Sequence, residues 1–403
     1  MTALVHRLSA RGPDDVAPLV EAIGAGRIEP AGIVAILGKT EGNGCVNDFT
    51  RAFAVKELRR ALSAHLPLTA VDSVSIVMSG GTEGGLAPHW LVLERRVARG
   101  GRGPALALGS AHTPDLPPAG LGRMAQVEMV AAGVRAAMAD AGIDDPADVH
   151  FVQIKCPLLT AERVAAADDA GTPTATRDAL KSMGLSRGAS ALGVALALGE
   201  IEPERIGDGL ICANYDLWSG RASTSAGVEL MNHEIVVLGM SRQWVGPLAI
   251  DHAVMADAVD VEPVRAAFTR CGLAAGTGQV ATGDRSRLVA LLAKAEAGTS
   301  GRPRGYRHTM LDDSDISSTR HARAFVGGVL AGLVGHAEIF VSGAPSIRGQ
   351  TAAAPSPSSP PARRRSNECA PRRSRSSCGR AASGDHSRNR RHDQELRRSH
   401  CPR

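Results

Sequence analysis

The sequence has no closely spaced cysteine pair, no long apolar run and few aromatic residues. Only 3% of its 403 residues are aromatic. Cys45, Cys156, Cys212 and Cys271 lie far apart, so they offer no zinc-ligand spacing and are typical of a reducing compartment. The longest apolar run, residues 325–334, is about half of the roughly 20 residues that a membrane-spanning helix needs. Because the N-terminus also lacks a signal-peptide pattern, we expect a soluble, cytoplasmic protein without a membrane partner.

Basic residues do not outnumber acidic ones until the last part of the chain. Residues 344–403 contain 14 Arg, no Lys and 4 acidic residues, whereas residues 1–343 contain 32 basic and 37 acidic residues. This acidic body has no basic stripe, so we expect no nucleic-acid partner. The length allows two or three domains of ordinary size.

A pattern of three elements occurs three times along the chain. A lysine ends a strand-like apolar stretch in "IVAILGK", "HFVQIK" and "LVALLAK", at Lys39, Lys155 and Lys294. An arginine opens an apolar helical stretch at Arg51, Arg187 and Arg323. A serine with a small neighbour ends a second strand-like stretch at Ser79 with Gly80, Ser225 with Ala226, and Ser342 with Gly343. Around the first two serines the match extends to a glycine and a glutamate, in "SGGTEG" and "SAGVEL".

Each element alone has an ordinary structural explanation. Strand-end lysines and helix-start arginines are usually solvated, and a serine before glycine usually marks a tight turn. Three copies in one order favour a shared function, because solvated positions have no reason to keep their chemical identity. The pattern predicts an α+β fold with pseudo-threefold symmetry. We place repeat A at residues 1–103, repeat B at 110–246 and repeat C at 251–343, separated by Gly/Pro-rich segments.

If the repeats surround one axis, their lysines, arginines and serines converge on one cationic cavity. Neighbouring positive charge and burial both lower the pKa of a lysine, so a lysine there can act as the base for an adjacent serine. Backbone N–H groups beside the small residues can receive the oxyanion of an acyl-transfer intermediate. The pattern therefore predicts hydrolysis of a compact, planar, anionic ring with several carbonyl groups. The residues alone make Ser79, with its glycine pair, the first candidate nucleophile and do not exclude Ser225.

Five segments, "MSGGTEG", "SAGVEL", "AKAEA", "RHTMLDDSDI" and "TRHARAF", resemble the ring-opening amidohydrolases, the family of cyanuric acid hydrolase and barbiturase. The resemblance covers residues 1–343. It implies three concatenated homologous α/β units around a central β-barrel-like core, with the site on the threefold axis. It also implies hydrolytic ring opening, which for cyanuric acid, an s-triazine, gives carboxybiuret and then biuret and CO2. Cyanuric acid is the substrate that we expect, and a barbiturate, opened to ureidomalonate, is the alternative.

The same resemblance gives each repeated residue a role. It makes Ser225 the nucleophile and Lys155 its general base. It implies that the substrate is held by Arg51, Arg187, Arg323, Ser79, Gly80, Ser225, Ala226, Ser342, Gly343, Lys39 and Lys294. It further implies no cofactor for catalysis, a structural divalent cation (Mg²⁺ or Ca²⁺) with Glu296 as carboxylate ligand, and a homotetramer. A merely solvated Glu296 is the alternative that the residues leave open.

The chain departs from the family pattern after Gly343. The pattern continues with Gly-Ala-Glu-His-Gln-Gly-Pro, a glycine run and a last strand, whereas this chain continues with "APSIRGQTAAAPSPSSPP". Removing one nucleotide from GC-rich codons for the family pattern gives those 18 residues. We therefore interpret residues 344–403 as an out-of-frame, disordered tail. Loss of the glycine loop and the last strand leaves a catalytically impaired family member as an alternative.

Two other classes of function remain open on the sequence. A fused ligand-binding protein without chemistry would use the same cavity, and the arginine-rich tail taken at face value is typical of a nucleic-acid-binding arm. The combination of Lys155 with Ser225 argues against the first. The codon relation argues against the second.

Overall fold

Three four-stranded sheets share one strand order. The first sheet contains, in spatial order, β1 (Thr2–Ser9), β4 (His89–Arg96), β2 (Ile33–Thr40) and β3 (Ser75–Gly80). The second contains β5 (Ala105–His112), β8 (Glu234–Ser241), β6 (Val149–Pro157) and β7 (Ala222–Gly227). The third contains β10 (His252–Met255), β13 (Gln350–Ala353), β11 (Leu292–Ala295) and β12 (Phe340–Gly343). The computed structural model describes residues 1–98, 100–273, 276, 278–343, 350–353 and 356–357.

The mixed α and β architecture predicted from the sequence is confirmed. In every sheet the last two strands in this order run parallel, and the other neighbours run antiparallel. Each sheet lies within or close to one predicted repeat, although β5 begins five residues before repeat B. None of the sheets formed by the described strands closes into a barrel, so the predicted barrel-like core is not found there. Among the described strands no pairing joins two of these sheets, and one apolar core contains residues of all three.

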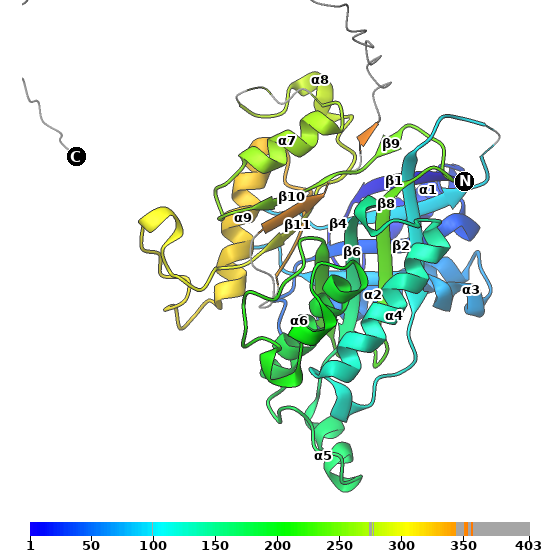
Figure 1. The fold of residues 1–403 in the computed structure, drawn as a ribbon. Coiled ribbons are helices and arrows are strands. Elements are labelled where there is room, and N and C mark those ends of the chain that lie inside the picture. The colour runs from blue at the N-terminus through cyan, green and yellow to red at the C-terminus, as the bar shows by residue number, and fades with distance from the viewer. Residues whose placement is uncertain (99, 274–275, 277, 344–349, 354–355, 358–403) are drawn as a thin grey trace, which may run out of the picture. The chain divides into compact units, whose positions relative to one another are not determined.

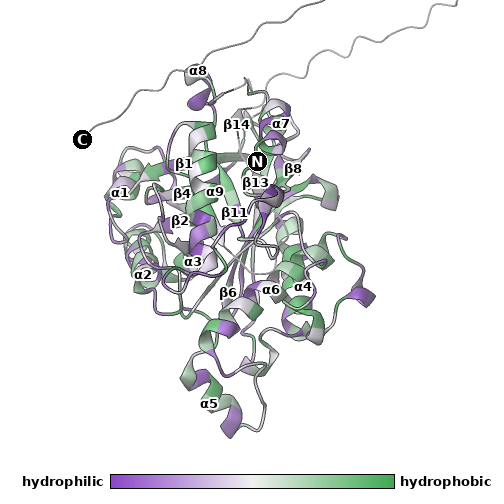
Figure 2. Ribbon diagram, turned by 90° about the vertical axis from the view of Figure 1, so that its left-hand side faces the viewer, coloured by the Kyte–Doolittle hydropathy of each residue, from purple (hydrophilic) through white to green (hydrophobic). Residues whose placement is uncertain are grey.

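Helices cover one face of each sheet (Figure 1). The first sheet packs against α1 (Ala17–Gly24) and α2 (Phe49–Ser63), which is followed by α3 (Leu68–Ser73). The second packs against α4 (Met124–Ala141) and α6 (Ala179–Ala197), with α5 (Ala161–Asp169) between them in the chain. The third packs against α7 (Glu262–Arg270) and α9 (Ser318–Val334), with the short α8 (Thr282–Arg285) between them in the chain. Figure 2 shows the apolar character of α4.

The strands that carry the site are buried on both faces. All eight residues of β2 are buried. Ile36 packs under the helices with Leu58, whereas Leu37, the next residue, joins an inner core with Phe151 of β6 and Phe340 of β12. Because successive side chains point to opposite faces, an unbroken apolar strand of this kind needs a cover on each side. The helices supply one cover and the neighbouring sheets supply the other.

A strand forms inside the segment for which the sequence predicts disorder. Strand β13 lies between β10 and β11, antiparallel to both, and takes the place that β4 and β8 have in the other sheets. Strand β14 (Ser356–Pro357) pairs with β9 (Leu248–Ala249). Without β13 the backbone N–H and C=O groups facing the gap would have no partner in the sheet, so even a short polar and small-residue strand is stabilised there. The remainder of the predicted tail lies outside the described residues.

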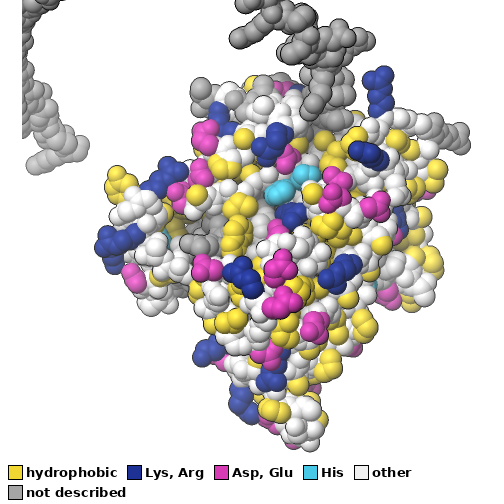
Figure 3. All heavy atoms as spheres, viewed as in Figure 1, with side chains coloured by type: hydrophobic (Ala, Val, Ile, Leu, Met, Phe, Trp, Pro, Cys, Tyr) yellow, Lys and Arg dark blue, Asp and Glu magenta, His cyan; other side chains and the backbone are white. Residues whose placement is uncertain are grey.

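Residues Met1–Ser359 group into one compact unit. No helix in the described part of the chain combines the length and the apolar content that crossing a bilayer requires. Acidic and basic side chains are interspersed on the face drawn in Figure 3, which shows no basic stripe there.

Candidate active site

Each sheet places its lysine beside its serine in the same register. In the three parallel strand pairs, Lys39 is opposite Ser79, Lys155 is opposite Ser225, and Lys294 is opposite Ser342. All three lysine side chains are fully buried. A lysine at a solvated strand end would be exposed, so the ordinary explanation of these lysines does not hold. Three Lys/Ser pairs therefore occupy equivalent places in the three sheets.

Three helices bring the arginines to the same region. Arg51 lies in the first turn of α2, where Asp48 caps the helix and also lies 3.7 Å from the Arg51 Nε atom. Arg323 lies in the second turn of α9. Arg187 lies in the middle of α6, because that helix begins at Ala179, and so the prediction that Arg187 opens its helix is wrong. Asp178 caps α6 by accepting a hydrogen bond from the Lys181 N–H group, which starts the helix earlier.

One small cavity collects the predicted substrate-binding residues. Its lining consists of Arg51, Ser79, Gly80, Arg187, Ser225, Ala226, Arg323, Ser342 and Gly343, together with Gly44. The three lysines lie behind this lining through their contacts with its serines and with Glu229. The room for a water-sized sphere is about 10 Å³, which is about one water molecule. A ring-sized ligand therefore needs the cavity to widen.

Burial and positive charge lower the pKa of two of the lysines. Burial lowers the pKa of Lys39 from 10.5 to about 7, and the Arg323 guanidinium adds to this effect. Burial also lowers the pKa of Lys294 to about 7, with Glu296 acting in the opposite direction and Arg187 in the same one. Amines with such pKa values are neutral in a substantial fraction of molecules near neutral pH. Such amines can accept a proton.

The side chains connect the repeats in a cyclic order. The Arg51 guanidinium donates to the Ala226 carbonyl at 2.6 Å, and Arg187 donates to the Gly343 carbonyl at 3.0 Å. Arg323 completes the cycle by pairing with Glu83, at 3.0 Å between Nε and Oε2. Each arginine therefore reaches the serine segment of the next repeat, from A to B, from B to C and from C to A.

Two lysines follow a cycle in the opposite direction. Lys39 donates to the Val341 carbonyl at 2.7 Å and lies 3.4 Å from the Ser79 hydroxyl. Lys294 donates to the Thr224 carbonyl at 2.9 Å and lies 3.5 Å from the Ser342 hydroxyl. Each of these carbonyls immediately precedes the serine of another repeat. The corresponding carbonyl in repeat A belongs to Met78.

The middle repeat breaks this pattern. The Lys155 ammonium pairs with Glu229, at 2.5 Å between Nζ and Oε1, and the hydroxyl of Ser225 donates to the Met78 carbonyl at 3.0 Å. Burial alone would raise the pKa of Glu229, but Lys155 and then Arg51 lower it overall. Repeat B therefore differs in chemistry from the other two, although its lysine and serine have the same register.

Three acidic residues of the site were not predicted from the sequence. Glu229 holds Lys155, Glu83 holds Arg323, and Asp48 caps α2 beside Arg51. The signal for the two glutamates was present in the matched segments "SGGTEG" and "SAGVEL", in which each glutamate stands four residues after the serine. The signal for Asp48 was its position as an acidic cap just before an apolar helix.

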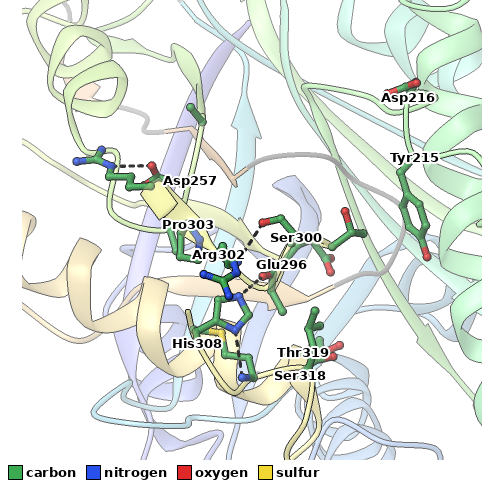
Figure 4. Close-up of a pocket in the computed structure, with 18 residues that line it drawn as sticks. Tyr215, Asp216, Asp257, Glu296, Ser300, Arg302, Pro303, His308, Ser318 and Thr319 are labelled. Atoms are coloured by element: carbon green, nitrogen blue, oxygen red, sulfur yellow. Dashed lines mark hydrogen bonds and ion pairs between the residues drawn. The ribbon is translucent and has the colours of Figure 1, made fainter. Parts of the chain in front are cut away.

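Glu296 is not in the lining of the small cavity; it lines a larger cavity of about 660 Å³ (Figure 4), and its charge acts on Lys294 and Arg187. Tyr215, His308 and Thr319 line the same cavity. Asp216 and Asp257 also line it, but no set of three closely spaced ligand side chains around Glu296 is found among the described residues. The carbonyl ligands expected for the cation belong to the glycine loop of the family pattern, which this chain lacks after Gly343.

His150, Asp251 and His252 form a separate cluster of metal-binding residue types. The two Nδ1 atoms of the histidines lie 2.9 Å apart, which is a hydrogen-bond distance. Asp251 accepts a hydrogen bond from the His252 N–H group and pairs with Arg270. The members of this cluster therefore hydrogen-bond to one another or pair with Arg270.

Known proteins that are similar to this chain belong to the family that the sequence motifs resemble. A family profile described as "Amidohydrolase ring-opening protein" matches residues 4–356. The chain is 62% identical over 358 residues to a cyanuric acid amidohydrolase of Bradyrhizobium sp. (strain ORS 375), covering 88% of this chain and 96% of that protein. It is 61% identical over 354 residues to one from Azorhizobium caulinodans, with coverage of 88% and 96%. The crystal structure of a cyanuric acid hydrolase from A. caulinodans matches with a TM-score of 0.83 at 60% identity, covering 89% of this chain and 99% of that one.

Proposed function

Because the chain belongs to the ring-opening amidohydrolase family, we propose that it is a cyanuric acid amidohydrolase that opens the s-triazine ring by hydrolysis of a ring amide. The observation that carries this proposal is the cavity lined by three arginines and three serines with three buried lysines behind them. Cyanuric acid has three equivalent carbonyl groups and acidic N–H groups. A site with one arginine, one serine and one lysine from each repeat matches both its shape and its charge.

Binding would use the arginines in their present orientation. Arg51 and Arg187 already donate to backbone carbonyls across the cavity. Ring carbonyls would replace those acceptors when the cavity widens, so the guanidinium groups would change partners without losing hydrogen bonds. A pseudo-threefold arrangement of the repeats would present the same contacts to each edge of the ring. That symmetry is part of the proposal, and the common strand order of the three sheets supports it.

The chemical steps require one nucleophile, for which we propose Ser225 with Lys155 as its base. The Ser225 oxygen would attack a ring carbonyl carbon while its proton moves to the neutral Lys155 Nζ atom. The ring C–N bond would then break as the ring nitrogen takes that proton, which leaves the opened ring as a carbamate ester on Ser225. A water molecule would hydrolyse this ester to give carboxybiuret and free Ser225. Carboxybiuret then loses CO2 to give biuret.

The contacts of repeat B support the choice of this pair. Lys39 and Lys294 each donate to a backbone carbonyl of another repeat, whereas Lys155 pairs with a carboxylate. A chemically distinct lysine beside one of three serines is what a site needs to select one nucleophile. The backbone N–H groups next to the serine would stabilise the oxyanion of the tetrahedral intermediate.

Further properties belong to the same proposal. A divalent cation, Mg²⁺ or Ca²⁺, would bind at Glu296 and have a structural role, since hard cations prefer oxygen ligands. The family resemblance also leads us to propose a homotetramer in the cytoplasm. No catalytic step uses the cation.

The experiment is a parallel assay of two rings. Purified protein is incubated with cyanuric acid and, separately, with barbituric acid, and the loss of ring absorbance and the formation of biuret or ureidomalonate are measured. We expect turnover of cyanuric acid and none of barbituric acid. Turnover of barbituric acid alone would replace the proposal with barbiturase activity.

A second protein serves as the control for the altered C-terminus. It carries the family pattern Gly-Ala-Glu-His-Gln-Gly-Pro and its continuation after Gly343, in place of residues 344–403. If only this frame-restored protein turns over cyanuric acid, the altered tail impairs the enzyme. Tight binding of cyanuric acid without turnover by both proteins would instead favour a binding protein.

A further inference from the structure

The two site glutamates fold back over a glycine of their own segment. Glu229 follows Ser225 in the sequence Ser-Ala-Gly-Val-Glu, and Gly227 is the glycine between them. A Cβ atom at Gly227 would overlap the Glu229 carboxyl group. The backbone at Gly227 lies outside the left-handed region, so this glycine is needed for space and not for its φ angle.

Repeat A has the same spacing, but its glycine, Gly81, also has a positive φ of 104°. Glu83 follows Ser79 in Ser-Gly-Gly-Thr-Glu, and a Cβ atom at Gly81 would overlap the Glu83 carboxyl group. The Glu83 side chain has a relative exposure of 12% and that of Glu229 has 14%. In both repeats the spacing Ser-x-Gly-x-Glu thus places a nearly buried carboxylate beside a cation of the site.

We propose that the glycine and glutamate of each Ser-x-Gly-x-Glu segment form a carboxylate clamp that positions one cation of the site, with Glu229 holding Lys155 and Glu83 holding Arg323. This proposal rests on the proposed function, because it names residues that position its general base and one of its substrate-binding arginines. Neither glutamate lines the cavity itself. Both therefore act through another residue.

The two clamps hold cations of different kinds. Arg323 stays charged at all working pH values, so Glu83 fixes only its position, through two contacts between guanidinium and carboxylate. Lys155 must lose a proton before it can act as a base. A carboxylate 2.5 Å from its Nζ atom favours the charged form, so Glu229 opposes the loss of that proton as well as fixing the position of the Lys155 side chain.

Other ionisable groups also lie near Lys155. They are Glu234 on β8, which is its register partner, Cys156 on β6, and Arg51 on α2, which faces Glu229. Burial raises the pKa of Glu234 to about 7, and burial also raises the pKa of the Cys156 thiol, so neither is a full negative charge at neutral pH. Glu229, with its lowered pKa, is the carboxylate among them that stays charged.

Repeat C has lost its clamp in the sequence. The segment after Ser342 reads Ser-Gly-Ala-Pro-Ser, whereas the family pattern in the other frame reads Ser-Gly-Gly-Ala-Glu. Both the glycine and the glutamate are thus replaced, and position 346 lies outside the described residues. By the cyclic order of the site, the cation that this glutamate would hold is Arg187. Arg187 donates to the carbonyls of Met183 and Gly343, and the carboxylate whose charge acts on it is Glu296.

The test compares Glu229→Gln, Gly227→Ala and Glu83→Gln in the full chain. For Glu229→Gln we expect the acidic limb of the kcat/KM profile for cyanuric acid to move about 1–2 pH units lower, because the amine loses its anionic partner. Gly227→Ala keeps the carboxylate but displaces it, so the same limb should move in the same direction. Glu83→Gln should raise KM about tenfold and leave the limb in place. Glu204→Gln, at an exposed site, is the control and should change neither.

A second measurement does not depend on activity. At pH 6 the Tm of Glu229→Gln should fall by ~5 °C or more, since Lys155 is then a buried charge without a partner, and the deficit should shrink by pH 10. If wild type does not turn over cyanuric acid, the proposed function fails while this measurement still tests the clamp. A Glu229→Gln deficit that is equal at both pH values, or an acidic limb that stays in place, would overturn the proposal.

Discussion

Replacing Lys39 with Met should make the protein more stable at pH 6 and less active. Lys39 is fully buried, and its pKa falls from 10.5 to about 7 mainly because burial disfavours the charged form. In the unfolded chain the same amine keeps its ordinary pKa. Between these two pKa values the unfolded chain binds one more proton than the folded chain, so this lysine makes stability rise with pH from about 7 to 10.5. Below pH 7 the folded protein carries the whole penalty of the buried charge.

The size of the effect follows from the pKa difference. At 1.36 kcal/mol per pKa unit, the penalty is ~5 kcal/mol at pH 6. Methionine removes it and keeps a similar volume. The substitution also removes the hydrogen bonds from Nζ to the Val341 carbonyl and the Ser79 hydroxyl, which together cost ~2 kcal/mol. The expected net gain at pH 6 is therefore about 3 kcal/mol, and it should vanish at pH ~9, so that the variant is no more stable than wild type at pH 9.5.

The assay is urea denaturation of wild type and Lys39→Met at pH 6 and pH 9.5, with turnover of cyanuric acid measured in parallel. Lys56→Met, at an exposed position of α2, is the matched control and should change stability by less than ~0.5 kcal/mol at either pH. If Lys39→Met is less stable than wild type at pH 6, or if its gain is the same at both pH values, Lys39 is not a strained buried amine and the electrostatic account of the cavity is wrong.

Three further outcomes are expected. Ser225→Ala should lower kcat about 10³-fold or more while lowering Tm by only a few °C, for the lost hydrogen bond to the Met78 carbonyl. An active variant would favour Ser79 as the nucleophile, and its alanine variant is assayed alongside. Arg187→Lys should lower kcat/KM about tenfold, measured by initial rates, because lysine cannot reproduce the planar guanidinium contacts; the exposed Arg205→Lys should not. Adding Ca²⁺ or Mg²⁺ should raise the Tm of the frame-restored protein more than the Tm of this chain, and Glu296→Gln in the frame-restored protein should abolish that difference. If the cation raises the Tm of all three proteins equally, it binds elsewhere.

The sequence alone determined which residue types recur and in which order. Lys39, Lys155 and Lys294 were recognisable because a charged residue ended an apolar stretch three times, and the structure places each of them opposite a serine in the same register. The same periodicity predicted strands before each lysine and serine. The predicted start of α6 at Arg187 was wrong. It rested on the apolar pattern that follows Arg187, whereas the helix begins at Ala179, after the cap residue Asp178.

Only the tertiary structure decided how the three repeats differ. In the sequence, Lys155 with Ser225 is equivalent to the other two pairs, and Ser79 was the better nucleophile by its glycines. The ion pair of Lys155 with Glu229 and the hydrogen bond from Ser225 to the Met78 carbonyl exist because side chains from different sheets meet at one cavity. Those contacts join residues far apart in the chain. Local patterns report the period and burial of an element, whereas the charge of a buried amine depends on every group that the fold brings within a few ångströms of it.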